Sequence, residues 1–255
     1  MTVVATVGTT HPLAFAGLTF ALLALSNDGV RPVCVVAGVT AQDADGVRAS
    51  VDVDSVVIRT QFDAVRTAGI GAFHVGALVS SAAVRAVADA LASFPNVPVV
   101  VDPVLAASGG HVLADDATRL ALRDALFARA TLITPNLDEA SALLGRTIAG
   151  VDEMHAAARA LLAFGASAAL VKGGHLTGDA VDVLAEPGGT REFRSARIDG
   201  TLRGTGDLLA VTVAANLARG MPLDEAIERA RERVRDAISR GVPFAGARVA
   251  PIGET

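Results

Sequence analysis

Short apolar runs alternate with stretches of helix length along most of this 255-residue chain, and this alternation limits the possible fold more than any other feature. Residues 97–101 are valines broken only by Pro98, as expected of a strand that is buried on both faces. Repeated strand–helix pairs predict a mostly parallel sheet with helices on both sides. The expected strands are residues 3–7, 33–36, 72–75, 97–101, 131–134 and 168–171, and the expected helices are 13–25, 81–93, 115–127, 137–144 and 152–164.

The pattern changes in the last third of the chain. Two apolar runs flank Glu186-Pro187-Gly188-Gly189, which indicates a β-hairpin. The elements expected here are hairpin strands at 180–185 and 191–194, helices at 205–218 and 223–239, and an irregular tail at 241–255. Because no repeat or linker interrupts the chain, we expect one domain over residues 1–255. The predicted fold class is α/β: a three-layer αβα sandwich whose mostly parallel sheet ends in a C-terminal hairpin.

Composition argues against several kinds of partner. The net charge is −5 and aromatic residues make up 4% of the chain, so neither a basic patch nor stacking platforms for nucleic acid are expected. No apolar run approaches the roughly 20 residues that span a bilayer, so we expect no membrane contact and a soluble, cytoplasmic protein. Cys34 is the only cysteine, and its apolar neighbours predict that it packs inside a buried strand.

Polar clusters follow four of the expected strands. They are Gly8-Thr9-Thr10, Asp102-Pro103, Thr134-Pro135-Asn136 and Lys172-Gly173-Gly174-His175. Ligands of open parallel sheets bind beyond the carboxyl ends of the strands, so these clusters locate a binding site. Lys172 is the only lysine in a chain that otherwise uses arginine for positive charge, which makes its position in such a cluster informative.

Gly204-Thr205-Gly206-Asp207 stands directly before an apolar helix. Two glycines permit a tight turn and a close approach to a ligand, and the free N–H groups of a helix start favour an anion such as a transferring phosphoryl group. A carboxylate in the same turn could accept the proton of an attacking hydroxyl. On the residues alone, the alternative is a helix cap in which Thr205 or Asp207 only satisfies backbone N–H groups.

Four ordered stretches together resemble the ribokinase-like superfamily. They are Val101-Asp102-Pro103-Val104 with Ser108-Gly109, residues 131–140 (TLITPNLDEA), residues 169–175 (ALVKGGH) and residues 204–207 (GTGD). They are most similar to the hydroxymethylpyrimidine/phosphomethylpyrimidine kinases of thiamin synthesis, with pyridoxal kinases second. The resemblance implies a ribokinase-like fold and an ATP- and Mg²⁺-dependent kinase. It also implies a hydroxymethyl heteroaromatic substrate and a homodimer.

The resemblance implies roles for the glycine-rich turn and for the lysine cluster. Asp207 would be the catalytic base, and the N–H groups of Gly204, Thr205 and Gly206 would form an anion hole. Lys172, together with Gly173, would bind the phosphates of ATP. His175 is expected to be a structural residue of its loop.

Three oxygen-bearing side chains are implied near the metal. Asn136 and Glu139 would organise Mg²⁺ and its waters beside the phosphates, because hard cations prefer oxygen ligands. Their alternative role is to cap the helix that begins there. Asp102 could support the metal or simply complete the turn at its strand end.

The N-terminal third departs from the family pattern. Gly8-Thr9-Thr10-His11-Pro12 lacks the Asp and the paired Gly of the family's pyrimidine-binding loop, although Gly8 and Thr10 are still expected near the substrate. Val39-Thr40-Ala41-Gln42-Asp43 resembles the family's TAQN segment, which implies substrate contacts from Val39 and Gln42. The Gln42 amide offers donors and an acceptor that suit an aminopyrimidine edge.

Asp207 also departs from the pyrimidine kinases, which commonly carry Cys at this place. Aspartate is the pattern of pyridoxal kinases and ribokinases, so the mechanism is retained and the identity of the substrate is open. The first hypothesis is a kinase for hydroxymethylpyrimidine, its monophosphate or both. The alternatives are a pyridoxal-type kinase and a non-catalytic sensor that binds a vitamin precursor.

Overall fold

A mixed sheet runs through the middle of the computed structural model, which describes residues 1–107, 110–174 and 176–251. Within these residues its nine strands follow the order β3-β2-β1-β4-β5-β6-β7-β8-β9. The parallel part comprises β1 (Val3–Thr10), β2 (Arg31–Gln42), β4 (Ala72–Val75), β5 (Val99–Val101), β6 (Leu132–Ile133) and β7 (Ala169–Lys172). The antiparallel edges are β3 (Val47–Asp52) on one side and the hairpin β8 (Ala180–Glu186) and β9 (Gly189–Ser195) on the other.

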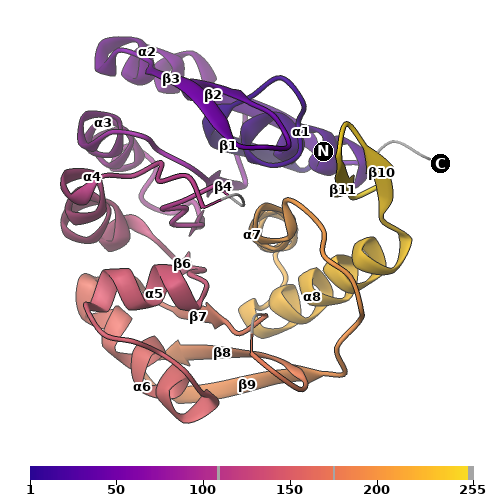
Figure 1. The fold of residues 1–255 in the computed structure, drawn as a ribbon. Helices are drawn as coiled ribbons and strands as arrows, with labels where there is room; N and C mark the ends of the chain where they lie inside the picture. Colours follow the sequence, from indigo (N-terminus) through magenta and orange to yellow (C-terminus); the bar gives the residue numbers. More distant parts are fainter. Residues whose placement is uncertain (108–109, 175, 252–255) are drawn as a thin grey trace.

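Helices cover both faces of the sheet (Figure 1), so the expected three-layer arrangement is confirmed. One layer contains α1 (Gly17–Asn27), α7 (Thr205–Ala218) and α8 (Leu223–Arg240). The other contains α2 (Ser55–Val65), α3 (Ser81–Leu91), α4 (Asp116–Ala121), α5 (Leu137–Leu144) and α6 (Val151–Leu161). Two separate apolar clusters fill the spaces between the sheet and these layers.

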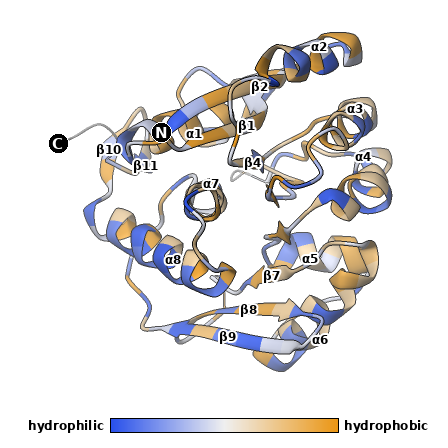
Figure 2. Cartoon of the chain, turned by 180° about the vertical axis from the view of Figure 1, so that it is seen from behind, coloured by the Kyte–Doolittle hydropathy of each residue, from blue (hydrophilic) through white to orange (hydrophobic). Residues whose placement is uncertain are grey.

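Helix α7 lies between the sheet and its neighbours α1 and α8, and its residues from Asp207 to Asn216 are all buried. A helix that is apolar on every side is stable only when it is covered in this way. Helix α8 is amphipathic by contrast, with both hydrophilic and hydrophobic stretches in Figure 2. None of the helices in the described ranges is long and apolar enough to cross a membrane.

Several local expectations differ from the structure. The first helix begins at Gly17 rather than at residue 13, because the chain from His11 to Ala16 turns irregularly and Ala14 has φ 50°. The helix expected at 115–127 divides into α4, a π-helical turn (Leu122–Leu126) and a 3₁₀ turn (Phe127–Arg129). Strand β3 and helix α2 were not expected.

The prediction of an irregular tail is wrong over residues 242–249. They form a second hairpin from β10 (Val242–Phe244) and β11 (Ala247–Val249). Ala245 and Gly246, which connect the strands, have φ values of 46° and 80°, and tight two-residue hairpins need such positive values. Phe244 packs edge-on against Phe15, with ring centroids 6.1 Å apart. This apolar contact holds the hairpin against the N-terminal part of the chain.

The prediction that Cys34 packs in the core is also wrong, because its side chain is exposed. Successive residues of a strand face opposite sides of the sheet. Val35 belongs to the cluster under α2 to α6, so Cys34 faces the other side. Strand β2 is next to the edge strand β3, and this part of its face is left open.

Candidate active site

The glycine-rich turn at the start of α7 has a backbone that only glycine adopts easily. Gly204 is the N-cap with φ 78°, and a Cβ on it would lie 2.4 Å from the Phe15 carbonyl oxygen. A Cβ on Gly206 would lie 3.1 Å from Lys172 Nζ and 3.2 Å from Asp102 Oδ2. No side chain caps this helix, so neither Thr205 nor Asp207 has the capping role that was the alternative. The turn therefore keeps its N–H groups available beside a buried cation.

Asp207 is buried in the first turn of α7, and its Oδ1 has no hydrogen-bond partner in the part of the chain that the structure describes. Burial raises the pKa of this carboxyl to about 7, and the charge of Asp102 adds to the rise. The backbone N–H of Gly17 and the charge of Lys172 act in the opposite direction. A carboxylate with a pKa near neutrality suits a general base.

Lys172, at the end of β7, forms a buried ion pair with Asp102, which follows β5. The Nζ–Oδ1 distance is 2.7 Å, and the Thr134 hydroxyl donates to the same oxygen at 2.9 Å. Burial by itself lowers the pKa of Lys172, but the neighbouring charges of Asp102 and Glu139 outweigh it and raise this pKa. The ammonium thus stays charged below the turn of α7, as a phosphate-binding group must.

Gly173 follows Lys172 and permits a close approach of two strands. A Cβ on it would lie 2.3 Å from the Val181 carbonyl oxygen. Its N–H already donates to that oxygen at 2.9 Å and to Asp182 Oδ1 at 3.0 Å. A phosphate contact from this N–H stays a prediction. Ser108, Gly109 and His175, named in the motifs, lie outside the described residues.

Asn136 and Glu139 form a capping box at the start of α5. Asn136 Oδ1 accepts the Glu139 N–H at 2.9 Å, and Glu139 Oε2 accepts the Asn136 N–H at 2.8 Å. Burial raises the pKa of Glu139 to about 7, although Lys172 opposes the rise. The helix-capping alternative therefore accounts for the contacts that these two side chains make.

The carboxylates near the α7 turn are the side chains that could hold the implied Mg²⁺. Among the described residues, no three His, Cys, Asp or Glu side chains gather into a closed metal site. In phosphoryl-transfer sites Mg²⁺ is commonly held by one or two carboxylates together with phosphates and water. Asp102 Oδ1 is already bound by Lys172 and Thr134, and Glu139 uses Oε2 in its capping box. The side chains present fit a metal held mainly by nucleotide phosphates.

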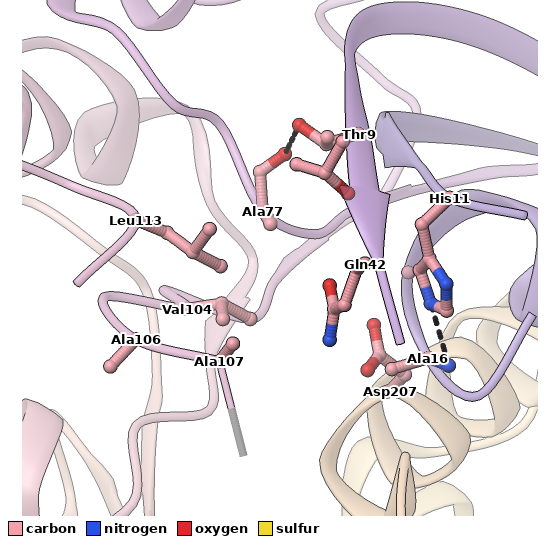
Figure 3. Close-up of a pocket in the computed structure, with 12 residues that line it drawn as sticks. Thr9, His11, Ala16, Gln42, Ala77, Val104, Ala106, Ala107, Leu113 and Asp207 are labelled. Carbon is pink, nitrogen blue, oxygen red and sulfur yellow. Dashed lines mark hydrogen bonds between the residues drawn. The ribbon is translucent and has the colours of Figure 1, made fainter. Parts of the chain in front are cut away.

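A first pocket opens beside Asp207 (Figure 3). Its lining comes from β1 and the loop after it, the start of α1, β2, the loops after β4 and β5, and α7: Thr9, His11, Ala16, Gly17, Thr40, Gln42, Ala77, Val104, Ala106, Ala107, Leu113 and Asp207. The side chains of Gln42 and Asp207 lie close together at its centre, opposite Val104 and Leu113. One polar amide and one carboxyl thus face an otherwise largely apolar wall.

Three residues expected at the substrate lie outside this lining. Gly8, Thr10 and Val39 are absent from it, whereas their neighbours Thr9, His11 and Thr40 are present. The Thr10 hydroxyl pairs with that of Thr19, and Val39 is 43% exposed. The alternation of side chains along a strand explains the one-residue offset. His11 and Thr40 are pocket residues that the motif comparison missed, although this alternation could have found them.

A second pocket of about 530 Å³ lies on the other side of the α7 turn. Near the turn it is lined by Asn136, Lys172, Thr205 and Gly206. Farther away it is lined by apolar and basic residues that include Leu202, Leu209, Val234, Ile238, Arg231 and Arg235. Sequence reasoning did not single out Arg231 and Arg235, because arginines are frequent along the whole chain.

The first turn of α7 therefore lies between the two pockets. Asp207 lines the first pocket, while Thr205 and Gly206 line the second. Lys172 extends from β7 beneath the same turn and also lines the second. This arrangement brings a base, an N–H-bearing turn and a cation to one point between two binding spaces.

Comparison with known proteins matches this geometry to a family. The sequence profile of the family described as phosphomethylpyrimidine kinase matches residues 12–252. The hydroxymethylpyrimidine/phosphomethylpyrimidine kinase of Streptomyces coelicolor is 37% identical over 233 residues, which cover 91% of this chain and 86% of that protein.

Solved structures give the same result. Phosphomethylpyrimidine kinase from Clostridium difficile has a TM-score of 0.83 at 27% identity, covering 93% of this chain and 100% of its own. An ADP complex of Bacillus subtilis pyridoxal kinase has a TM-score of 0.90 at 29% identity, covering 99% and 97%.

The fold and the site define a ribokinase-like small-molecule kinase that uses ATP. Within that class, the chain belongs to the phosphomethylpyrimidine kinase family. The resemblance stated from the four sequence motifs is thereby confirmed. The roles of the individual residues stay predictions.

Proposed function

We propose that this chain transfers the γ-phosphoryl group of ATP to hydroxymethylpyrimidine, to its monophosphate, or to both. One observation carries the proposal: the first turn of α7 separates two pockets, with Asp207 in one and the backbone of Thr205 and Gly206 in the other. A base that directly follows the residues of an anion-binding turn suits direct transfer between ligands in adjacent pockets.

The proposed reaction is a displacement at the γ-phosphorus. The substrate hydroxyl oxygen forms a bond to the phosphorus, the bond to the ADP oxygen breaks, and Asp207 accepts the hydroxyl proton. The N–H groups of residues 204–207 and the Lys172 ammonium stabilise the charge on the transferring group. When the substrate is the monophosphate, its phosphate oxygen is the nucleophile.

Mg²⁺ would be held by the nucleotide phosphates with Glu139, while Asp102 would hold Lys172 beside those phosphates. When bound, the metal would neutralise phosphate charge. Glu139 fits this role because only one of its carboxylate oxygens, Oε2, takes part in the capping box at the start of α5. Asn136 would orient the same helix start.

Recognition of the aromatic ring is assigned to the first pocket. Gln42 would hydrogen-bond the polar edge of the ring, while Val104 and Leu113 would cover its face. A pyridoxal-type substrate is the second candidate, because Asp207 occupies the position where pyrimidine kinases commonly carry Cys and because the Bacillus subtilis pyridoxal kinase is a similar structure.

ADP release separates the candidates. We expect turnover when hydroxymethylpyrimidine is supplied with ATP and Mg²⁺, and weaker turnover with pyridoxal, measured with a coupled assay at equal substrate concentrations. The product should be a phosphate ester of the ring's hydroxymethyl group, detected by mass spectrometry. Turnover of pyridoxal alone would overturn the first choice. Ligand binding without any ADP release from either alcohol would instead support the sensor.

A further inference from the structure

His74 is a buried side chain in the middle of the sheet that the proposed reaction does not use. It lies on β4 between Thr6 of β1 and Val100 of β5. Its neighbours Phe73 and Val75 belong to the cluster under α2 to α6, so His74 faces the opposite layer, which contains α7. The sheet therefore presents an imidazole toward the helix that carries Asp207.

The two nitrogens of His74 differ in their contacts. Nδ1 is hydrogen-bonded to the hydroxyl of Thr6 at 2.9 Å, whereas Nε2 is buried and has no partner within residues 1–107, 110–174 and 176–251. Burial lowers the pKa of His74 to about 4, so the ring is neutral near pH 7 and carries a single N–H. An unpaired buried nitrogen costs free energy, which calls for a partner in the working enzyme.

The second unpaired atom in this region is Asp207 Oδ1. Both atoms surround Gly76, the residue that follows β4. The position that a Cβ on Gly76 would occupy lies 3.6 Å from Asp207 Oδ1 and 3.9 Å from His74 Nε2. Because glycine has no side chain, no carbon projects between Gly76 and the two polar atoms, and a water molecule farther from the backbone than the Cβ position could touch both.

We propose that His74 is a positioning residue for the base: its Nε2–H group holds Asp207 Oδ1 through one bridging water molecule in the space left by Gly76. The hydroxyl of Thr6 donates to Nδ1 and so fixes the tautomer that carries the proton on Nε2. The contact orients the carboxylate, whose other oxygen lies on the side of the Gly17 N–H and the first pocket. This inference rests on the proposed role of Asp207.

The charged groups around His74 agree with a neutral donor. Asp102 after β5 and Lys172 on β7 act on it with opposite signs, and Glu139 on α5 interacts with the same pair. From α7 the facing group is Asp207. A neutral N–H that points at a carboxylate needs no further counter-ion.

Two amide variants of His74 distinguish the roles of its two ring nitrogens. His74→Asn keeps an amide where Nδ1 lies and loses the group at Nε2, whereas His74→Gln places an amide near Nε2. We expect His74→Asn to lower kcat at least about tenfold with little change in the KM for ATP. We expect His74→Gln to keep most of kcat. The acid limb of the kcat/KM pH profile should move upward in His74→Asn, because a donor to the ionised carboxylate is lost.

Gly76→Ala tests the water position directly. A Cβ there makes only ordinary contacts of 3.5–3.9 Å, so the variant should fold, yet the methyl group would occupy space that the bridging water needs. We expect it to reproduce the kcat loss of His74→Asn with an unchanged melting temperature. Adding His74→Asn to Asp207→Asn should cause no further loss, since the contact is already gone.

Three outcomes decide the matter. Wild-type kcat in His74→Asn and Gly76→Ala, with Asp207→Asn inactive, would overturn the inference and leave the proposed function intact. Equal losses in His74→Asn and His74→Gln, each with a lower melting temperature, would make His74 merely structural. Full activity of Asp207→Asn would instead remove the base assignment itself.

Discussion

At the scale of single residues, the site depends on burying charge beside a ligand space. Asp207, Lys172, Asp102 and Glu139 come from four different elements and converge below the turn of α7. Burial raises the pKa of Asp207 and of Glu139, whereas the charges of Asp102 and Glu139 raise the pKa of Lys172 against the effect of burial. Asp207 Oδ1 has no hydrogen-bond partner among the described residues, although this carboxyl must be ionised to act as a base.

Asp207→Asn should therefore lower activity and raise stability. We expect a loss of about 10²–10⁴ in kcat with ATP binding nearly unchanged, since a general base contributes about this much. The folded carboxyl has a pKa raised from 3.8 to about 7, so ionising it destabilises the fold progressively as the pH rises through that interval. At pH 8 the free energy of unfolding of the variant should exceed that of wild type by on the order of 1–3 kcal/mol, with a correspondingly higher melting temperature. This difference should disappear near pH 4.

Measurements of kcat/KM and of the melting temperature as a function of pH would test the raised pKa of Asp207. In the wild type, kcat/KM should fall as the pH drops below about 7, because Asp207 becomes protonated. A melting temperature of Asp207→Asn equal to that of wild type at pH 8 would show that the buried charge is not costly. A flat activity profile from pH 5 to pH 8 would contradict the pKa assignment.

At the scale of elements, the start of α7 shows how backbone geometry makes a binding turn. The helix is buried on all sides, so its position is fixed by packing, and its N-terminus meets the carboxyl ends of β5 and β7 through Asp102 and Lys172. Gly204 is left-handed, and it has no room for a side chain because the Phe15 carbonyl oxygen lies against it. A side chain at this position would move the turn away from the cation.

Gly204→Ala and Gly220→Ala form a matched pair. Both glycines have positive φ, 78° and 81°, but a Cβ meets the Phe15 carbonyl oxygen only at Gly204 and meets nothing within 4 Å at Gly220. Both variants should lose roughly 1–2 kcal/mol from backbone strain. Gly204→Ala should lose more, and ADP release should fall at least about tenfold only there.

Thermal unfolding and the coupled ADP assay distinguish these effects. Equal destabilisation and equal activity in the two variants would mean that the Phe15 contact is relieved without moving the turn. Activity lost in Gly220→Ala as well would point to a general loss of fold, because Gly220 lies at the opposite end of α7.

At the scale of the whole molecule, the C-terminal hairpin meets the loop before α1 near the first pocket. The Arg203 N–H donates to the Arg248 carbonyl at 3.0 Å, and the Arg203 guanidinium donates to the Ala44 carbonyl at 2.6 Å. Phe244 of the C-terminal hairpin contacts Phe15. The hairpin thus supports the residue before the glycine turn and the loop that covers Asp207.

Deleting residues 242–255 should disturb this support. We expect a lower melting temperature and a KM for the alcohol substrate raised at least about threefold, with a smaller change in the KM for ATP, because the hairpin lies near the first pocket. Deleting only residues 252–255 is the control and should leave both constants unchanged. An equal rise of both KM values would show a general loss of structure instead.

The layered fold follows from sequence pattern, and so does the place of the site. Apolar valine runs with helix-length spacers require a parallel sheet that is covered on both faces, and the polar residues after those runs must meet at one edge. The α5 and α7 boundaries agree with prediction because Asn136 and Gly204 mark their starts locally. Sequence pattern did not predict the hairpin at 242–249, because the residue that it packs against, Phe15, is distant in sequence.

The sequence by itself determined which residues could do chemistry: an isolated lysine, a glycine turn and an acid at a helix start. Only the tertiary structure decided which of them meet and in what state. The ion pair of Lys172 with Asp102 and the burial of Asp207 beside His74 join residues far apart in the chain. Such contacts depend on the packing of several elements at once, because burial and charge are properties of an environment rather than of a residue.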